Sequence, residues 1–425
     1  SYLARSSYML QQGKFVADII YYYGEDNNIT SLFTNRLPVI PEGYNYDFVN
    51  ADALLHLLNV NNDQIVTPSG MNYRLLALDS NSVRMTLVVL KKISQLVKAG
   101  AVVVGPAPAG SPGLGDAADE YGAIVKELWG AGEDIRNVGK GKVFNGKTIQ
   151  QALDALKVAP DFQYTKPQAN TDILYVHRKL SNQEFYWINN RTDVVQDIEA
   201  TFRITGRPVE IWHPETGKTE QASYSFAGGN TKVPLRLEPN DAVFVVFKGN
   251  TAVASRVVPP LKETQLTLID NNWQLKFQAG RGAPLQAPVG KLGSWTENTD
   301  AGIKYFSGTG TYSNTLVADK TWFSKSASLV LDLGDVKNLA EVFVNGKSAG
   351  IVWKKPFKID VAKVLKPGSN TLEIKVTNLW VNRLIGDQQP GATNTITYTT
   401  MPFYRATSPL LPSGLFGPVR ILSVQ

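Results

Sequence analysis

A cluster of aromatic and polar side chains near residue 380 could bind a sugar. Trp380, Asn382, Arg383 and Asp387 follow a β-rich segment. An indole face can pack on the C–H groups of a pyranose ring while guanidinium and carboxylate groups bind its hydroxyls. The same residues could instead form an Arg383–Asp387 ion pair that braces a loop beneath residues 398–412. The sequence leaves both interpretations open.

Carboxylates also follow predicted strands in the first third of the chain. Glu25 comes after an apolar run that ends at Tyr23, and Asp47 and Asp52 lie on the next connection. Open parallel sheets bind ligands at the carboxyl ends of their strands, so these acids could form a cluster that faces a ligand. Loop carboxylates are usually exposed, however, and we favour a solvated loop for all three.

Composition excludes several classes of function. The 425 residues include 43 Lys and Arg against 37 Asp and Glu, a net charge of +6 with no basic run, so we expect no nucleic-acid partner. No apolar run approaches the roughly 20 residues of a membrane span. The absence of cysteine excludes disulfides, thiolate metal sites and cysteine nucleophiles. The histidines, His56, His177 and His213, lie at no zinc-ligand spacing, and we expect no metal site in this chain.

Strand and helix signals alternate over residues 14–160. Three nearly continuous apolar runs indicate strands that are buried on both faces. They are residues 15–23, 75–78 and 101–104. Between them, helical spacing predicts a helix capped by Ser82 and ended by Gly100, and a second helix over 118–129. This order predicts a small open parallel α/β sheet.

The rest of the chain is rich in short β segments. We expect an antiparallel β-sandwich over 161–257 and a jelly roll over 258–425, in which Asn345-Gly346 forms a two-residue hairpin turn. The whole chain is thus predicted to be a multidomain protein of α/β and all-β parts. It opens within a helix that closes at Gly13, so we expect residues 1–13 to belong to a preceding domain.

The last block carries several motifs together. They are Val344-Asn345-Gly346-Lys347, Gly350-Ile351-Val352-Trp353, Pro356-Phe357, Leu365-Lys366-Pro367-Gly368-Ser369-Asn370-Thr371-Leu372 and Val376-Thr377-Asn378. With them, this block resembles the galactose-binding-like jelly roll that serves as the sugar-binding domain of glycoside hydrolase family 2. We expect Trp353 itself to lie in the core.

Further motifs extend a resemblance over essentially the whole chain. They are Gln11-Gln12-Gly13-Lys14-Phe15-Val16-Ala17-Asp18, Gly43-Tyr44-Asn45-Tyr46-Asp47, Gly105-Pro106, Asn378-Leu379-Trp380-Val381-Asn382-Arg383-Leu384-Ile385-Gly386-Asp387 and Ser413-Gly414-Leu415-Phe416-Gly417-Pro418-Val419. Together they resemble the C-terminal portion of a glycoside hydrolase family 106 α-L-rhamnosidase. The α/β block is also similar to the amidotransferase-like, flavodoxin-like domain of family 42 β-galactosidases.

The family 106 resemblance implies a (β/α)8 barrel that carries two catalytic glutamates and a sugar-binding calcium ion. Such an enzyme removes terminal α-L-rhamnose from plant-type glycans or glycosides with inversion, using an acid and a base about 6.5–9.5 Å apart. The family's Ser-Trp-Glu and Glu-Gly-Phe-Thr motifs do not occur here. We therefore expect the glutamates and the calcium upstream of Ser1, in a barrel whose last helix is 1–13. Glu25 is the fallback catalytic candidate, and the segment alone should be inactive.

Two other functions stay open. One is a non-catalytic carbohydrate-binding or scaffold module, and the other is a β-galactosidase-like hydrolase. In the rhamnosidase case the partners would be a rhamnose-containing glycan and the preceding barrel, and the resemblance implies a bacterial protein that is secreted or periplasmic. Asp47 is a further candidate for sugar contact, beside the cluster at residues 380–387.

Overall fold

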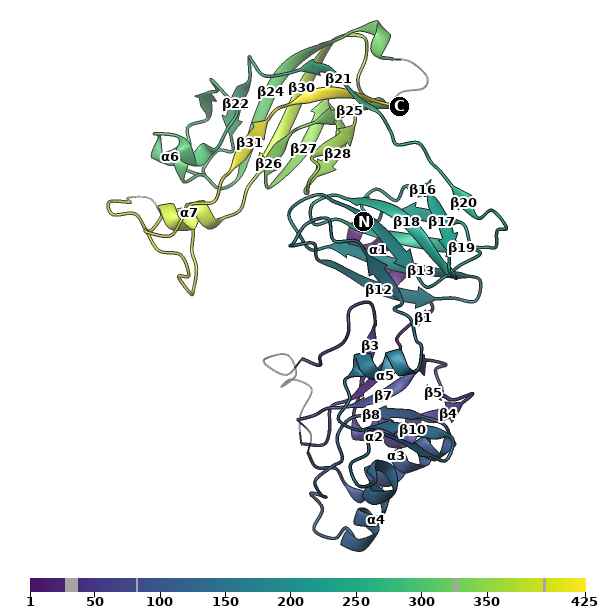
Figure 1. Cartoon of the computed structure of the whole chain (residues 1–425). Coiled ribbons are helices and arrows are strands. Elements are labelled where there is room, and N and C mark those ends of the chain that lie inside the picture. The colour runs from purple at the N-terminus through teal and green to yellow at the C-terminus, as the bar shows by residue number, and fades with distance from the viewer. Residues whose placement is uncertain (27–36, 82, 324–327, 393–394) are drawn as a thin grey trace. The chain divides into compact units, whose positions relative to one another are not determined.

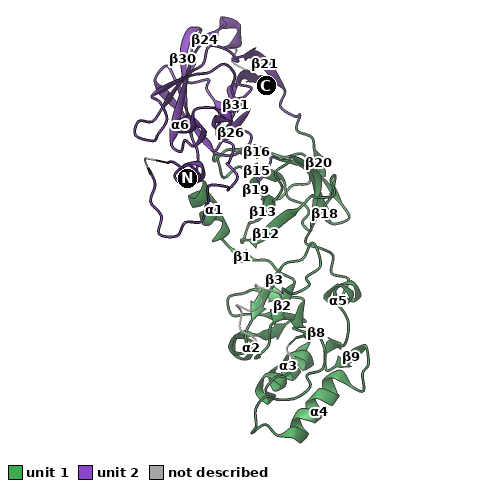
Figure 2. Cartoon of the chain, turned by 90° about the vertical axis from the view of Figure 1, so that its left-hand side faces the viewer, with its two compact units in different colours: residues 1–237, 241–258 green, residues 238–240, 259–425 purple. Residues whose placement is uncertain are grey.

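The computed structural model describes residues 1–425 except 27–36, 82, 324–327 and 393–394. The chain forms two compact units, which Figure 2 colours separately. Unit 1 comprises residues 1–237 and 241–258, and unit 2 comprises residues 238–240 and 259–425. Both units consist mainly of strands, and within the described ranges no helix is long and apolar enough to cross a membrane.

Unit 1 contains the predicted open α/β sheet (Figure 1). In spatial order its strands are β3 (Tyr46–Val49), β2 (Ile19–Tyr22), β7 (Leu75–Leu78), β8 (Val102–Val104), β10 (Gly141–Phe144) and β9 (Ile135–Val138). All neighbours run parallel except β9, which is antiparallel to β10. This is the flavodoxin-like order, with the first strand between the second and the third.

Helices cover both faces of this sheet. They are α2 (Ala51–Leu57), α3 (Leu87–Ala99), α4 (Ala118–Trp129) and α5 (Ile149–Ala155). The apolar sides of α3 and α4 pack on one face, and Ala152 and Leu153 of α5 pack on the other. Because each strand is covered twice, the strands read as continuous apolar runs. A small antiparallel sheet lies beside them, with β4 (Asn59–Asn61), β5 (Gln64–Val66) and β6 (Asn72–Tyr73).

Three details of the α/β prediction were wrong or fall outside the structure. The apolar run at 15–23 is broken, because Asp18 turns its buried carboxylate toward a second part of the unit. The segment 141–144, for which we predicted no strand, is the fifth parallel strand. The helix α3 starts at Leu87 with Thr86 as its N-cap residue, while Ser82 lies outside the described residues.

The second part of unit 1 is the predicted β-sandwich. One sheet has the order β1 (Lys14–Phe15), β12 (Ile173–Lys179), β13 (Gln183–Asn190), β19 (Ala242–Lys248), β15 (Val209–Trp212) and β16 (Thr219–Gln221). The other has β11 (Phe162–Tyr164), β14 (Gln196–Phe202), β18 (Asn230–Leu237), β17 (Tyr224–Ala227) and β20 (Ser255–Arg256). Aromatic and aliphatic side chains fill the space between the sheets. The first helix, α1 (Tyr2–Leu10), packs Met9 and Leu10 on a small apolar cluster with Phe185 and Phe244.

Unit 2 is an antiparallel β-sandwich of the jelly-roll kind. Its larger sheet has β23 (Gln286–Pro288), β22 (Gln274–Phe277), β24 (Thr309–Ala318), β30 (Gly368–Thr377), β27 (Leu339–Val344) and β28 (Lys347–Val352). The smaller sheet has β21 (Glu263–Leu268), β32 (Arg420–Val424), β25 (Ser328–Asp332) and β29 (Lys358–Asp360), and β26 (Asp335–Lys337) pairs with β31 (Gly414–Gly417). Two short helices, α6 (Ala301–Lys304) and α7 (Val381–Gly386), lie outside the sheets.

The predicted turn at Asn345-Gly346 is confirmed. It joins β27 to β28, and both residues have positive φ, which the type I′ turn requires. The expectation for Trp353 was wrong, since this side chain is 45% exposed. The core contains Phe357 instead, together with Trp273, Trp295 and Tyr312. The strand β28 ends at Val352, so Trp353 follows the sheet and does not continue its inward face.

Gly141 offers a test of how tightly β10 packs beside β8. A Cβ at this position would clash with the backbone carbonyl oxygens of Val97 and Ala101. We expect Gly141→Ala to lower the free energy of unfolding of unit 1 by about 2 kcal/mol or more. The matched control is Gly122→Ala in α4, where a Cβ meets nothing and should stabilise the helix by about 0.5–1 kcal/mol. Denaturant unfolding of both variants measures the difference, and equal stabilities would contradict the packing.

Candidate functional site

The polar residues of the predicted sugar site are buried around α7 in unit 2. Asn382, almost fully buried, donates from its amide to the carbonyl of Leu411 at 2.8 Å and to Ser413 Oγ at 2.9 Å. Its own oxygen accepts a 2.8 Å hydrogen bond from the Leu411 amide. Asn378 also donates to Ser413 Oγ, at 3.0 Å. These bonds fasten the segment around residue 412 to the helix.

Arg383 and Asp387 form the expected ion pair one turn apart. The guanidinium Nη2 lies 2.8 Å from Asp387 Oδ1, and both side chains are at least nine-tenths buried. The other carboxylate oxygen accepts from the amides of Ile396 and Thr397 and from the Thr397 hydroxyl, at 2.6–2.9 Å. Burial opposes ionisation, but the Thr397 bonds and Arg383 outweigh it and hold the pKa of Asp387 below its usual range.

The described contacts of these three polar residues are therefore those of a braced loop. Trp380, in contrast, is 45% exposed at the start of α7, and the Arg281 guanidinium lies 4.6 Å from its ring centroid. The structure thus separates the members of the cluster. Asn382, Arg383 and Asp387 hold the loop in place, and Trp380 presents an aromatic surface. Direct sugar contact by any of them stays a prediction.

The three carboxylates of the α/β part do not form one cluster. Glu25 accepts from the amide and hydroxyl of Thr86 at 2.7 and 3.0 Å, so it caps the N-terminus of α3. Asp47 lies within the strand β3, not on a connection, and accepts a 2.7 Å bond from the Tyr73 hydroxyl. Burial raises the pKa of Asp47. Asp52, exposed in the first turn of α2, pairs with His56.

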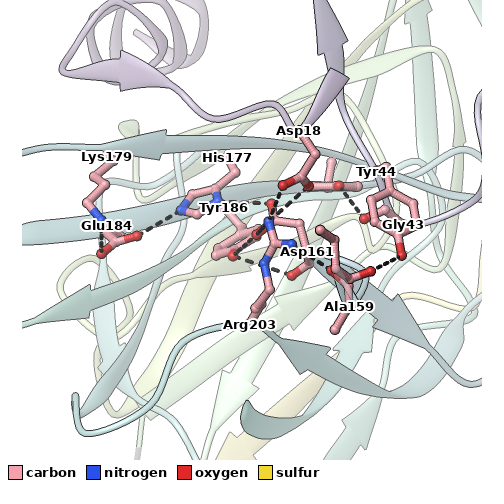
Figure 3. A network of polar contacts seen from close by, with 12 residues as sticks. Asp18, Gly43, Tyr44, Ala159, Asp161, His177, Lys179, Glu184, Tyr186 and Arg203 are labelled. Atoms are coloured by element: carbon pink, nitrogen blue, oxygen red, sulfur yellow. Dashed lines mark hydrogen bonds and ion pairs between the residues drawn. The ribbon is translucent and has the colours of Figure 1, made fainter. Parts of the chain in front are cut away.

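A second polar network, which the sequence did not reveal, lies within unit 1 where the α/β part meets the sandwich (Figure 3). His177 on β12 places Nδ1 2.9 Å from Asp161 and Nε2 3.2 Å from Glu184. The Tyr186 hydroxyl donates to Asp161 at 2.9 Å, and its ring stacks on the imidazole at 3.9 Å between centroids. Both ring nitrogens therefore face carboxylate oxygens, which accept hydrogen bonds and cannot donate them when ionised.

Arg203 links this network to the α/β part. Its Nη2 lies 2.9 and 3.0 Å from the two carboxylate oxygens of Asp18, and 3.5 Å from Asp161. Asp18 and Asp161 are both almost fully buried, so each carboxylate needs a cation beside it. Three carboxylates face Arg203, Lys179 and, when protonated, His177. The network lies on the wall of a cleft of about 780 Å³.

The charge balance favours a protonated His177. Burial alone would lower the pKa of His177, but Asp161 and Glu184 outweigh it and raise that pKa. Burial raises the pKa of Glu184, but the hydrogen bond and charge of His177, together with Lys179 and Arg207, outweigh burial and lower that pKa. No serine, threonine or lysine nucleophile is bonded to His177 among the described contacts. Chemically, the arrangement acts as an ionic clamp between the α/β sheet and the sandwich.

One sequence signal could have indicated this clamp. His177 occupies an inward position of β12, two residues from Tyr175, where the alternation calls for an apolar side chain. A buried polar residue at such a position implies a partner on the facing elements. The partners themselves could not be found in this way, since Asp161 precedes β11 and Asp18 precedes β2.

The described residues do not fit a metal centre. Among them, no group of three or more His, Asp or Glu side chains is placed to hold a metal ion. The carboxylates of the two networks are instead neutralised by Arg203, His177 and Arg383.

Comparison with known families shows to which family the chain belongs. The family model of glycoside hydrolase family 106, described as alpha-L-rhamnosidase, matches residues 1–226, more than half of the chain. The chain belongs to this family. The model of the family 2 sugar-binding domain matches residues 240–409, which include α7 and the loop that follows it. The predicted resemblance to both families is therefore confirmed.

Individual relatives agree with this membership. A solved rhamnosidase from Novosphingobium sp. PP1Y is 44% identical with a TM-score of 0.88, and the match covers 99% of this family 106 chain and 40% of that protein. A Formosa agariphila protein, provisionally named a beta-glucuronidase, is 25% identical over 99% of the chain and 56% of its own length. A GH42 beta-galactosidase from G. stearothermophilus is 11% identical, covering 58% of the chain and 42% of its own, with a TM-score of 0.37, too low to bear on function. The chain thus spans only about half of the length of the two relatives that it matches over 99% of its own residues.

The ionic clamp predicts a stability that depends on pH. His177→Gln removes the cation between two buried carboxylates, and we expect it to lower the free energy of unfolding of unit 1 by about 3 kcal/mol near pH 6. Because the folded-state pKa of His177 is raised, its contribution is complete below the unfolded-state pKa of about 6.5 and is lost as pH rises through the folded-state value. Denaturant unfolding from pH 6 to 9 should therefore show the free energies of unfolding of wild type and His177→Gln converging as pH rises.

The matched control for this test is His213→Gln. His213 also lies beside a glutamate, Glu220 at 3.0 Å, but on the surface of the sandwich. We expect a change within about 0.5 kcal/mol at every pH. A constant difference between wild type and His177→Gln across the range would contradict a protonated His177.

The brace at α7 can be tested with Asn382→Ala. This change leaves the amide and carbonyl of Leu411 without their partner in a buried position, so we expect unit 2 to lose about 1–3 kcal/mol. Limited proteolysis should then cut the segment 395–412 faster than in wild type. Unchanged stability and cleavage would show that Asn382 does not brace the loop.

Proposed function

We propose that this chain is the C-terminal accessory region of an enzyme that removes terminal α-L-rhamnose from plant-type glycans or glycosides. The observation that carries the proposal is the 44% identity and the TM-score of 0.88 to a rhamnosidase over 99% of the chain. Fold likeness alone would not suffice, since one fold serves many activities. At this level of identity over the whole chain, the family model and the structure point in the same direction.

The catalytic pair, in this proposal, lies in a part of the enzyme before residue 1. The match covers only 40% of the solved rhamnosidase, which leaves room for a catalytic barrel. Within the chain, the fallback candidate Glu25 is engaged at the N-terminus of α3. An inverting mechanism needs one carboxylic acid at the leaving oxygen and one carboxylate that activates water on the opposite face of the sugar. We assign both roles to barrel glutamates.

The same proposal places the sugar-binding calcium ion in the barrel. Because the described residues offer no suitable ligand set, no step of the reaction is assigned to a metal held by this chain. When bound, calcium would supply oxygen-coordinating sites for sugar hydroxyls. We further propose that the enzyme is bacterial and works outside the cytoplasm, in the periplasm or secreted, where a polymeric glycan would be met.

A second candidate is a non-catalytic carbohydrate-binding module. The match of residues 240–409 to a sugar-binding domain favours it. Both candidates have a carbohydrate as their ligand. They differ in whether any form of the protein hydrolyses a glycoside.

The decisive test compares the 425-residue chain with the full-length natural polypeptide. Both are assayed with p-nitrophenyl α-L-rhamnoside, and proton NMR of the first product reports the anomeric configuration. We expect the longer protein to release rhamnose with inversion and the chain alone to be inactive. The same proteins are assayed with p-nitrophenyl β-galactoside, and cleavage of this substrate in place of the rhamnoside would support the β-galactosidase-like alternative. A full-length protein that is inactive on both but binds rhamnosides would favour the binding module.

A further inference from the structure

The loop after α7 carries large side chains that point into solvent. Tyr398 is 89% exposed and Phe403 is 84% exposed, and Trp380 lies at the start of the same helix. We call Trp380, Tyr398 and Phe403 the aromatic rim. The loop projects away from the sheets of unit 2 (Figure 1). Exposed apolar groups gathered in this way usually mark a binding surface.

Two hollows lie along this rim. The first, of about 450 Å³, is bordered by Trp380, Tyr398 and Ile396. The second, of about 520 Å³, is bordered by Tyr398 and Phe403. Tyr398 thus borders both hollows. Each hollow has the size of a site for a small ligand.

The rim stands on a rigid support. Asp387 accepts three hydrogen bonds from Ile396 and Thr397, directly before Tyr398. Gln389 donates to the carbonyl of Ala406 at 2.9 Å and so fastens the other end of the loop. A surface that is held in advance loses little conformational entropy when a ligand binds. The buried polar residues of the α7 cluster therefore position the aromatic rim.

The chemistry of the hollows fits a neutral sugar. Apolar side chains alternate with hydroxyl and amide groups, including those of Thr395, Thr399 and Gln388. Asp387 is the one charged side chain among the lining residues that the structure describes, and Arg383 neutralises it. Aromatic faces pack on the C–H groups of a pyranose, while amides and hydroxyls bind its oxygens. Among the described residues that line these hollows, none is a cation that could pair with a carboxylate or sulfate.

We propose that the aromatic rim binds a neutral pyranose unit of the glycan, packed against the ring of Tyr398. The proposal rests on the function proposed above and adds to it a contact surface outside the barrel. The ligand class is an uncharged sugar with at least one apolar face. The Arg281 guanidinium covers one face of Trp380, so that ring supports the first hollow from the side.

The test measures binding to the 425-residue chain by saturation-transfer NMR titration. The probes are methyl α-L-rhamnoside and, as the charged comparison, glucuronate. We expect millimolar binding of the rhamnoside and at least fivefold weaker binding of glucuronate. Tyr398→Ala should weaken rhamnoside binding about five- to tenfold, while Tyr398→Phe, which keeps the ring, should stay within about twofold. Thermal melts confirm that each variant folds.

Trp353 provides a matched control for Trp380. Both indoles are 45% exposed on unit 2, and Trp380 lines the first hollow, whereas Trp353 lines neither of the two hollows of the rim. We expect Trp380→Ala to weaken binding and Trp353→Ala to leave it unchanged.

Four results would overturn the proposal. The first is rhamnoside binding that Tyr398→Ala does not alter. The second is binding of glucuronate as tight as that of the rhamnoside. The third is a full-length protein that hydrolyses the rhamnoside while the chain does not bind it and the rhamnoside does not protect Tyr398 from iodination. The proposed function would then stand without the aromatic rim. The fourth is protection of Tyr398 from iodination in the full-length protein without any sugar, which would identify another part of that protein as the occupant of the hollows.

Discussion

The architecture of unit 1 depends on the buried pairing between Arg203 and Asp18. Neither the α/β sheet nor the sandwich could bury its own charged residue alone, because an unpaired ion in a protein interior costs several kcal/mol. Asp18 lies in the segment before β2, and Arg203 directly follows β14. His177 and Asp161 complete the arrangement on the sandwich side. The pairing favours the arrangement in which Asp18 faces Arg203, because any other would leave a buried charge without its partner.

Unit 2 uses the same principle for a different purpose. There, Arg383 and Asp387 bury their charges together and direct the remaining carboxylate oxygen at the backbone of the following loop. Since that oxygen accepts three hydrogen bonds, the loop needs no strand pairing to hold its course. Aromatic side chains can consequently be exposed on an irregular segment. In a sheet, every second side chain would point inward.

Sequence patterns predicted the elements whose signals are local. The buried strands at 75–78 and 102–104, the helix at 118–129 and the hairpin at Asn345-Gly346 each rest on periodicity or turn chemistry within a few residues. The short strand β10 was missed because a four-residue strand that begins with a glycine carries too little pattern.

The candidate site divides in the same way. The Arg383–Asp387 pair follows from an i, i+4 spacing on a helix and was anticipated as one of two interpretations. The exposure of Tyr398 and Phe403 is set by how the loop leaves α7, and the clamp around His177 joins residues from five separate elements and connections. No spacing rule encodes such long-range contacts. Only the alternation that buries His177 carried a trace of them.

The two-residue strand β1 has a consequence for the assembly of unit 1. It pairs with β12, more than 160 positions along the chain, so the α/β sheet is an insertion between two strands of one sandwich sheet. Closing a loop of that length from an unfolded chain costs about 4–5 kcal/mol of entropy. If the inserted sheet becomes compact first, its ends are already near each other and the effective loop shortens. The nascent chain then has a natural order of events, in which the insert forms before the frame around it closes.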